Sequence, residues 1–275
     1  MKNILEKIVA YKKEEIQKRK ELYPTKLLEQ SIYFETPVVS LSQFIQRPDK
    51  QGIIAEFKRQ SPSKGPINPY ATVEEVSIGY MQGGASALSV LTDTHFFGGK
   101  NEDLTTARKF NYAPILNKNF VIDEYQVIEA KSIGADAVLL IAECLTAGEL
   151  QNLAQLAQQL GMEVLMEIHT AKQLSKLCPA VNLVGINNRD LNSFEVNIEQ
   201  SLEIAALLPA HLPKISESGI NDPATVVYLK KEGFDGFLIG EHFMQDAYPG
   251  RACAEFIHQI ELLTATAEST VKTLV

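Results

Sequence analysis

Cysteine is scarce in this chain, and long apolar runs are absent. The three cysteines, Cys144, Cys178 and Cys253, lie far apart and form no CxxC spacing. This pattern argues against a disulfide framework or a zinc site and favours a reducing compartment. No run of about 18 apolar residues is present, and the N-terminal segment lacks the apolar core of a signal peptide. We therefore expect a cytoplasmic protein with no membrane contact.

Basic residues are outnumbered by acidic ones. The chain carries 26 lysines and arginines against 34 aspartates and glutamates, which gives a net charge of −8 at pH 7. Because no basic stripe is present, nucleic acid is not expected as a partner. The 275 residues are 45% hydrophobic, which suits one large domain or two small ones with ample core.

The first fifty residues differ in pattern from the rest. Apolar residues recur at a helical spacing over residues 3–22, and the charged runs KKEE and KRK between them are interpreted as a solvated helix face. We expect residues 1–50 to form a helical extension packed on a main body of residues 51–265, followed by a tail at 266–275. The apolar positions of the helix are Ile4, Leu5, Ile8, Val9 and Ile16.

From residue 53 onward, short apolar runs rich in β-branched residues alternate with helix-patterned segments. This alternation predicts right-handed βαβ units and a parallel sheet. Eight units at spacings of roughly twenty to thirty residues match an α/β protein of the (β/α)8 TIM barrel class. A doubly wound open sheet is the alternative, although no GxGxxG follows the first run. The expected strands are 53–57, 87–92, 114–118, 137–141, 163–168, 183–188, 213–218 and 236–240.

Charged and polar side chains stand at the ends of five of these strands. In such a barrel the carboxyl ends of the strands carry the working residues. Burying charges without partners is costly, so a purely structural barrel would not need this density of ionisable groups. The alternative is a set of ion pairs that closes the top of the barrel. The candidates are Glu56, Lys58, Lys118, Glu167, Asn187, Arg189, Glu217 and Ser218.

Two glycines, Gly219 and Gly240, directly follow the last two strands. Backbone N–H groups at these places often hold a phosphate in barrels, although the glycines could also serve only tight turns. The first and last strands are neighbours in a closed barrel. Lys58 could therefore reach the same phosphate, and Ser61 could add a hydroxyl group.

These segments resemble the indole-3-glycerol phosphate synthase family. The likeness is carried, in order along most of the chain, by IIAEFKRQSPSKGPI, ALSVLTDTHFFGG, PILNKNF, VLMEIHT, GINNRDL, ISESGI and FLIGEHFM. The resemblance implies a ring closure in L-tryptophan biosynthesis. The substrate would be 1-(2-carboxyphenylamino)-1-deoxyribulose 5-phosphate, and the products indole-3-glycerol phosphate, carbon dioxide and water. No metal or other cofactor is implied, and the partner is a phosphorylated small molecule.

The resemblance also implies roles for the strand-end residues. Lys118 would protonate the ketone oxygen, Glu167 would remove a proton as the indole forms, and Lys58 would bind substrate and be the alternative acid for the dehydration. We expect burial and a nearby cation to lower the pKa of Lys118, so that it can act as an acid near neutral pH. The implied binding groups are Glu56, Asn187, Ser218 and Ser61 for the substrate, Arg189 and Glu217 for holding Lys118, and Ser218, Gly219, Gly240, Glu241 and Lys58 for the phosphate.

Two positions depart from the family pattern. Asn119 stands where the family often has Asp, and Glu241 stands where some members have Ser. A carboxylate would repel a phosphate, so we expect the Glu241 side chain to turn outward and only its N–H to face the ligand. The five histidines are expected at surface or packing positions: His95, His169, His211, His242 and His258.

Two other functions fit the sequence less well. A phosphoribosylanthranilate isomerase would need a Cys/Asp pair at strand ends, and neither Cys144 nor Cys178 sits at such a place. A non-catalytic scaffold with a decayed barrel would be expected to lack at least one of the strand-end charges. With helices covering the sheet and no obvious apolar patch, we expect a monomer.

Overall fold

The computed structural model describes residues 4–190 and 195–273, with side chains described as far as residue 266. Within these residues, eight parallel strands close into a ring in the order β1-β10-β9-β8-β7-β6-β5-β4. β1 pairs with both β10 and β4, so the expected TIM barrel is confirmed. The strands agree with the expected ones to within one residue at each end: β1 Ile53–Phe57, β4 Ala87–Leu91, β5 Ile115–Lys118, β6 Ala137–Ile141, β7 Glu163–Ile168, β8 Leu183–Asn187, β9 Lys214–Glu217 and β10 Gly236–Ile239.

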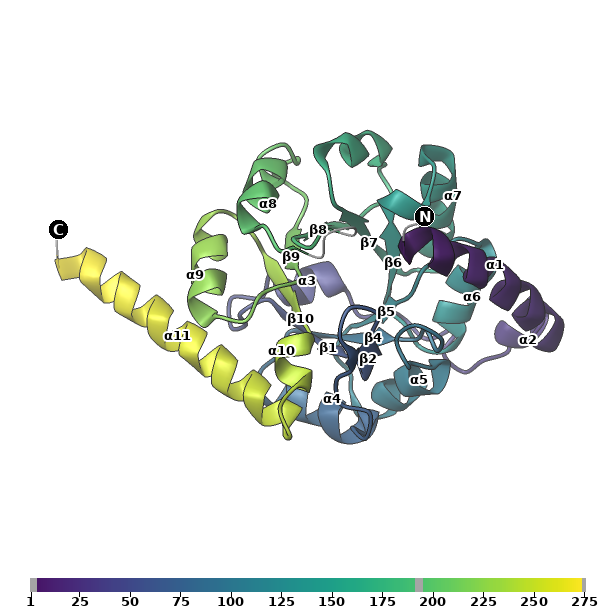
Figure 1. Ribbon diagram of the computed structural model, residues 1–275, viewed down its shortest axis with the longest axis horizontal. Coiled ribbons are helices and arrows are strands. Elements are labelled where there is room, and N and C mark those ends of the chain that lie inside the picture. Colours follow the sequence, from purple (N-terminus) through teal and green to yellow (C-terminus); the bar gives the residue numbers. More distant parts are fainter. Residues whose placement is uncertain (1–3, 191–194, 274–275) are drawn as a thin grey trace.

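Helices surround this ring (Figure 1). Thr146 and Asp222 cap α7 and α9 with their side chains, and Pro223 is the first residue of α9. Only a 3-10 helix, η2, follows β7, and a two-stranded hairpin of β2 and β3 follows β1. The bounds are α1 Ile4–Leu22, α2 Thr25–Leu28, α3 Leu41–Ile45, β2 Gln60–Ser61, β3 Gly65–Pro66, α4 Val73–Gln82, α5 Asn101–Phe110, α6 Glu124–Ser132, η1 Ala142–Cys144, α7 Ala147–Gln159, η2 Ala171–Lys176, α8 Ile198–Ala205, α9 Pro223–Lys231, α10 Glu241–Met244 and α11 Pro249–Thr273.

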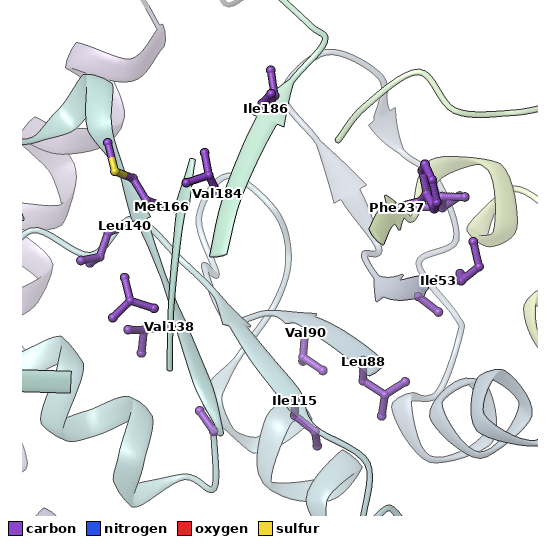
Figure 2. Packing of buried hydrophobic residues seen from close by; sticks show 14 of the residues in the cluster. Ile53, Leu88, Val90, Ile115, Val138, Leu140, Met166, Val184, Ile186 and Phe237 are labelled. Carbon is purple, nitrogen blue, oxygen red and sulfur yellow. The ribbon is translucent and has the colours of Figure 1, made fainter. Parts of the chain in front are cut away.

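The alternation of side chains along each strand produces two separate cores. One set of strand residues points outward and packs under the helices, as Leu88, Val90, Val138 and Leu140 do in Figure 2. The other set fills the interior of the barrel. At the carboxyl ends of the strands this inward set changes from apolar to ionisable residues, and this change creates the site.

The N-terminal extension contributes to the interior core at both ends of the barrel. Leu41 and Ile45 of α3 belong to this core, as do Leu5 and Ile8 of α1. Ile45 approaches Gly236 at the start of β10, whereas Leu5 and Ile8 lie at the opposite, carboxyl end of the strands. The division of the chain at residues 50 and 265 stays a prediction.

One expectation about the extension is wrong. Lys12, within the supposedly solvated KKEE run, is only 1% exposed, and its Nζ lies 2.8 Å from Asp93 Oδ2. The physical reason is its place on the helix, because Lys12 follows Leu5 and Ile8 on the face that α1 turns toward the barrel. Lys13 is exposed, as expected.

The described residues stop short of both ends of the chain. Residue 3, at the start of the expected first helix, lies outside the described residues, as do residues 274–275 of the expected tail. α11 continues as far as Thr273, and its second half projects away from the barrel (Figure 1). In the described ranges, no helix combines the length and the apolar character needed to cross a bilayer.

Candidate active site

All of the expected site residues line one cavity of about 310 Å³ at the carboxyl ends of the strands. Their convergence follows from strand alternation, since each stands at an inward position or in the loop just after it. The site therefore occupies a single face of the barrel. These residues are Glu56, Lys58, Ser61, Lys118, Glu167, Asn187, Arg189, Glu217, Ser218, Gly219, Gly240 and Glu241.

Lys118, at the end of β5, is the centre of the charged group. Its Nζ lies 2.5 Å from Glu217 Oε2 and 3.1 Å from Glu167 Oε2. The other oxygen of Glu167, Oε1, accepts a hydrogen bond of 3.0 Å from Asn187 Nδ2. Three strands thus hold one ammonium group between two carboxylates, and an amide fixes the orientation of one of them.

The expected lowering of the pKa of Lys118 is wrong. Burial acts to lower this pKa, but the carboxylates of Glu217, Glu167 and Glu56 outweigh burial and raise it above its usual value. The neighbours of the ammonium are anions rather than a second cation. Lys118 is therefore a fully protonated donor at neutral pH.

The two carboxylates beside Lys118 are driven in opposite directions. Burial tends to raise the pKa of Glu167, but Lys118, His169 and Asn187 together lower it. Burial also raises the pKa of Glu217, and here the nearby Glu167 charge adds to burial so that Lys118 does not reverse the shift. One carboxylate is therefore held ionised, and the other is the first to accept a proton.

His169 makes a contact that sequence reasoning missed. Its side chain is only 9% exposed, which agrees with the expected packing position, but its Nε2 also lies 3.4 Å from Glu167 Oε1. Its place two residues after Glu167, just beyond the end of β7, was the signal that could have revealed this contact.

Two glycines leave room for the carboxylates. A Cβ at Gly185 on β8 would lie 2.0 Å from Glu217 Oε1, and a Cβ at Gly240 would lie 2.6 Å from Glu56 Oε1. Separations under 3.0 Å cannot be tolerated without a shift. Gly240 was expected as part of a phosphate cradle or of a tight turn, but it also allows Glu56 to reach the cavity.

Lys58 and Glu56 form a second charged group on the β1 side of the cavity. The Nζ of Lys58 lies 2.9 Å from Glu56 Oε1, and Ser89 Oγ lies 3.5 Å from Glu56 Oε2. Both side chains also line the cavity, so they form an ion pair and remain part of the site.

The loop after β9 makes a turn with left-handed backbone at two successive residues. Ser218 and Gly219 both have φ of 72°, in the left-handed region that a serine rarely adopts. Asn188 maintains this turn, because its Nδ2 donates to the Ser218 carbonyl at 2.7 Å. Sequence reasoning missed Asn188, although it lies within the GINNRDL motif. Strain in a turn at the mouth of a site is typical of functional loops.

Arg189 and Glu241 lie together at the mouth of the cavity. Glu217 contacts Lys118 as expected, whereas the Nη2 of Arg189 lies 3.7 Å from Glu241 Oε2 instead. Lys64, in the β2–β3 hairpin, approaches the other oxygen of Glu241 at 3.6 Å. The Glu241 carboxylate, 26% exposed, is therefore located between two cations at the rim.

Asn119, the other departure from the family pattern, is buried beside Lys118. Its Nδ2 donates to Thr92 Oγ1 at 2.9 Å, and its Oδ1 accepts from the Phe120 amide at 2.9 Å. The side chain thus ties the end of β5 to the end of β4. The Asn119 amide bonds to Thr92 and Phe120, whereas the Lys118 ammonium bonds to Glu167 and Glu217.

An apolar wall completes the cavity. Residues of α1, which sequence reasoning assigned only to packing, lie beside the ends of β6 and the loops after β4 and β5. The wall gives the cavity one face suited to an aromatic ring and another suited to proton transfer. Its members are Ile4, Leu5, Ile8, Phe97, Phe120, Leu139 and Ile141.

The polar groups of the cavity suit proton transfer and hydrogen bonding. They include ammonium, guanidinium, carboxylate, amide, imidazole and hydroxyl groups. Across the described ranges, no three His, Cys, Asp or Glu side chains are grouped so as to hold a metal ion.

Solved structures share this architecture at low sequence identity. The chain is similar to the tryptophan synthase alpha chain from Legionella pneumophila, with a TM-score of 0.60 and 13% identity. That match covers 80% of this chain and 97% of the other. A likeness at this identity supports the barrel fold alone.

The sequence comparisons are more specific. A family model described as indole-3-glycerol phosphate synthase matches residues 5–256. A relative of that name from Bacteroides thetaiotaomicron is 45% identical over 261 residues, which cover 95% of this chain and all of the relative. Another of that name, from Campylobacter hominis, is 40% identical over 88% of this chain and 94% of its own length. The chain therefore belongs to the indole-3-glycerol phosphate synthase family, carboxy-lyases of tryptophan biosynthesis that act on a phosphorylated small molecule.

Proposed function

We propose that the group centred on Lys118 performs the ring closure and that Lys118 is its general acid. The observation that carries this proposal is the position of the Lys118 ammonium, held between Glu167 and Glu217 on the wall of the cavity. As a ring carbon attacks the ketone, negative charge develops on the ketone oxygen. An alkoxide is a stronger base than an amine, so Lys118 can donate its proton even with a raised pKa.

Glu167 is proposed as the base. Carbon dioxide leaves the ring carbon that attacked, and the hydroxyl group formed from the ketone then leaves as water. During this loss the adjacent carbon of the new ring becomes acidic enough for a carboxylate to take its proton. The lowered pKa of Glu167 keeps it ionised for this step, and Asn187 holds it in position.

Lys58 is proposed as the second acid and as a substrate-binding group. It lies on the β1 side of the cavity with Glu56, apart from the Lys118 group. The hydroxyl group that leaves must gain a proton, and Lys58 is the other ammonium group of the cavity lining able to supply it. Proton transfer from a placed group of this kind contributes on the order of 10²–10⁴ in rate.

The phosphate is proposed to bind between the loops after β9 and β10. Backbone N–H groups of Gly219, Gly240 and Glu241 would donate to it, with the Ser218 and Ser61 side chains and Lys58 beside them. Asn187 and Glu56 would bind the sugar and anthranilate groups. The monomeric state and the cytoplasmic location remain predictions.

Fluorescence tests the proposed function directly. The protein contains no tryptophan, whereas the product contains an indole. Wild-type protein mixed with the substrate is expected to develop indole emission together with an equal amount of carbon dioxide. Emission without release of carbon dioxide, or neither signal, would contradict the reaction.

The Lys118→Ala variant is the matched test of the assignment of the acid. This variant is expected to develop no indole emission under the same conditions. Emission at the wild-type rate from this variant would support the reaction but show that Lys118 is not its general acid.

A further inference from the structure

We propose that the buried ion pair of Lys12 and Asp93 positions α1 as the aromatic-facing wall of the cavity and thereby sets the affinity for substrate. The two residues are positioning residues, since neither lines the cavity. The inference rests on the proposed function, because the aromatic ring that this wall would contact is the anthranilate ring of the proposed substrate. The inference concerns substrate binding, whereas the proposed roles of Lys118 and Glu167 concern proton transfer.

The burial of the pair is the first observation. Lys12 is 1% and Asp93 0% exposed, and Lys12 Nζ lies 2.8 Å from Asp93 Oδ2. The same Nζ also lies 2.6 Å from Glu15 Oε2, one turn further along α1. A buried charge is tolerated only with partners, and removing one member leaves the other uncompensated. The docking of α1 on the barrel therefore depends on both charges.

Asp93 joins two walls of the cavity. Its Oδ1 accepts hydrogen bonds from the backbone amides of Phe96 at 2.6 Å and Phe97 at 3.1 Å. The Phe97 side chain lines the cavity. One carboxylate thus fixes the loop after β4 through Oδ1 and fixes α1 through Oδ2. A change in the pair would move both apolar surfaces that face the substrate.

Lys12 stands between the part of α1 that lines the cavity and the part that forms ion pairs with residues at α6. Ile8, one turn before Lys12, lines the cavity. Beyond Lys12, Arg19 pairs with Glu129 and Lys20 with Asp123. The largely exposed pair of Lys20 stabilises little, whereas Glu129 in the pair of Arg19 is buried.

A second hollow also separates this part of α1 from the barrel. Its volume is about 80 Å³, and it lies between α1 and the loops after β4 and β5. Lys12, Ile16 and Arg19 are among its lining residues. Leu5 and Ile8 pack into the interior core and Ile16 is buried beyond them, so the pair of Lys12 and Asp93 adds a buried charged attachment between these apolar contacts.

The expected effect on catalysis follows from the geometry. The wall formed by Ile4, Leu5 and Ile8 offers apolar contact and no proton-transfer group. The network of Lys118 and Glu167 is built entirely from strand ends and does not include α1. Loosening α1 should therefore raise KM and leave kcat nearly unchanged.

The experiment compares Lys12→Met with Lys13→Met. Methionine keeps a flexible unbranched side chain, slightly shorter than that of lysine, and removes the charge. Lys13 is the exposed neighbour on the same helix. For Lys12→Met we expect KM to rise about tenfold or more with kcat within about threefold of wild type. Amide hydrogen exchange in α1 should accelerate at the same time. Lys13→Met should match wild type in all three measurements.

The double variant Lys12→Met/Asp93→Asn tests whether the two side chains act together. Asparagine keeps an oxygen for the Phe96 and Phe97 amides and removes the uncompensated charge. The KM of the double variant should be no higher than that of Lys12→Met, because the effects of substituting two coupled residues are not additive.

Three results would overturn the inference. An unchanged KM for Lys12→Met, even with a lower melting temperature, would make the pair purely structural. A tenfold or greater loss of kcat in Lys12→Met without a change in KM would mean that the pair affects proton transfer. Unaltered hydrogen exchange in α1 would show that the pair does not hold the helix. Wild-type protein without activity would instead contradict the proposed function, and the exchange measurement would still test the pair.

Discussion

Lys118 and Glu217 belong to strands on opposite sides of the barrel, yet their side chains meet at 2.5 Å. β5 and β9 are separated by three strands in either direction around the ring. Only the inward-pointing side chains of a closed sheet can be joined in this way. Around this contact, Lys118 and Lys58 supply two ammonium groups, and Glu217, Glu167 and Glu56 supply three carboxylates.

Removing the ammonium at the centre should stop turnover. We expect Lys118→Ala to abolish product formation while substrate binding stays largely intact, because the binding groups lie on other strands. Single-turnover kinetics and calorimetric titration measure the two properties separately. Lys109→Ala, at an exposed position at the end of α5, is the control. Product formation by Lys118→Ala would show that the acid is another residue.

The raised pKa of Glu217 predicts a pH-dependent stability. A carboxyl group whose folded pKa lies above its ordinary value of 4.5 stabilises the fold below that pH, and this contribution is lost as pH rises through the folded pKa. The difference in free energy of unfolding between wild type and Glu217→Gln should therefore shrink from pH 4 to pH 8. A folded pKa that lies one pH unit above the unfolded one corresponds to about 1.4 kcal/mol.

Glu167→Gln provides the comparison with opposite sign. The folded pKa of Glu167 is lowered, so its contribution is present above 4.5 and is lost as pH falls through the folded pKa. Denaturant titrations over the pH series measure both slopes. Parallel slopes for the two variants would contradict the opposite shifts.

The glycine that makes room for Glu217 should be required for activity. In Gly185→Ala the new Cβ would lie 2.0 Å from Glu217 Oε1 and would push that carboxylate away from Lys118. We expect kcat to fall about tenfold or more and the stability to drop by about 1–3 kcal/mol. Gly148→Ala in α7 is the matched control, since a Cβ there meets no atom within 4 Å. Equal kcat for the two variants would contradict this role of Gly185.

The carboxylate at the cavity mouth should have a small effect on binding. Glu241 is located between Arg189 and Lys64, so its charge is offset before a phosphate arrives. We expect Glu241→Ser to change substrate affinity by less than about tenfold, or about 1.4 kcal/mol. Isothermal titration measures this change. A tightening of tenfold or more would mean that Glu241 points into the phosphate site.

Sequence patterns were sufficient to place the strands and the residues at their ends. Period-two alternation and the turn residues after each strand locate Glu56, Lys118, Glu167 and Glu217 without knowledge of their neighbours. The proton affinities could not be predicted in the same way. The pKa of Lys118 was expected to fall and is raised, because it depends on which charges lie nearby, and these charges come from strands distant in the sequence.

The N-terminal helix shows the same limit. Its apolar spacing was sufficient to predict α1, but the charges of KKEE gave no sign that Lys12 is buried while Lys13 is exposed. The partner that makes this burial possible, Asp93, belongs to the loop after β4. A charge run is read correctly only when the surface facing the helix is known.

The order of residues by itself determined the barrel, its family and the set of ionisable groups at the strand ends, because periodicity and motifs are local properties of the chain. Tertiary structure decided which of these groups touch: Glu217 against Lys118, Arg189 against Glu241, and Lys12 against Asp93. The physical reason is that burial and Coulomb energy depend on distances in space, and closing the ring of strands brings together residues that are far apart along the sequence.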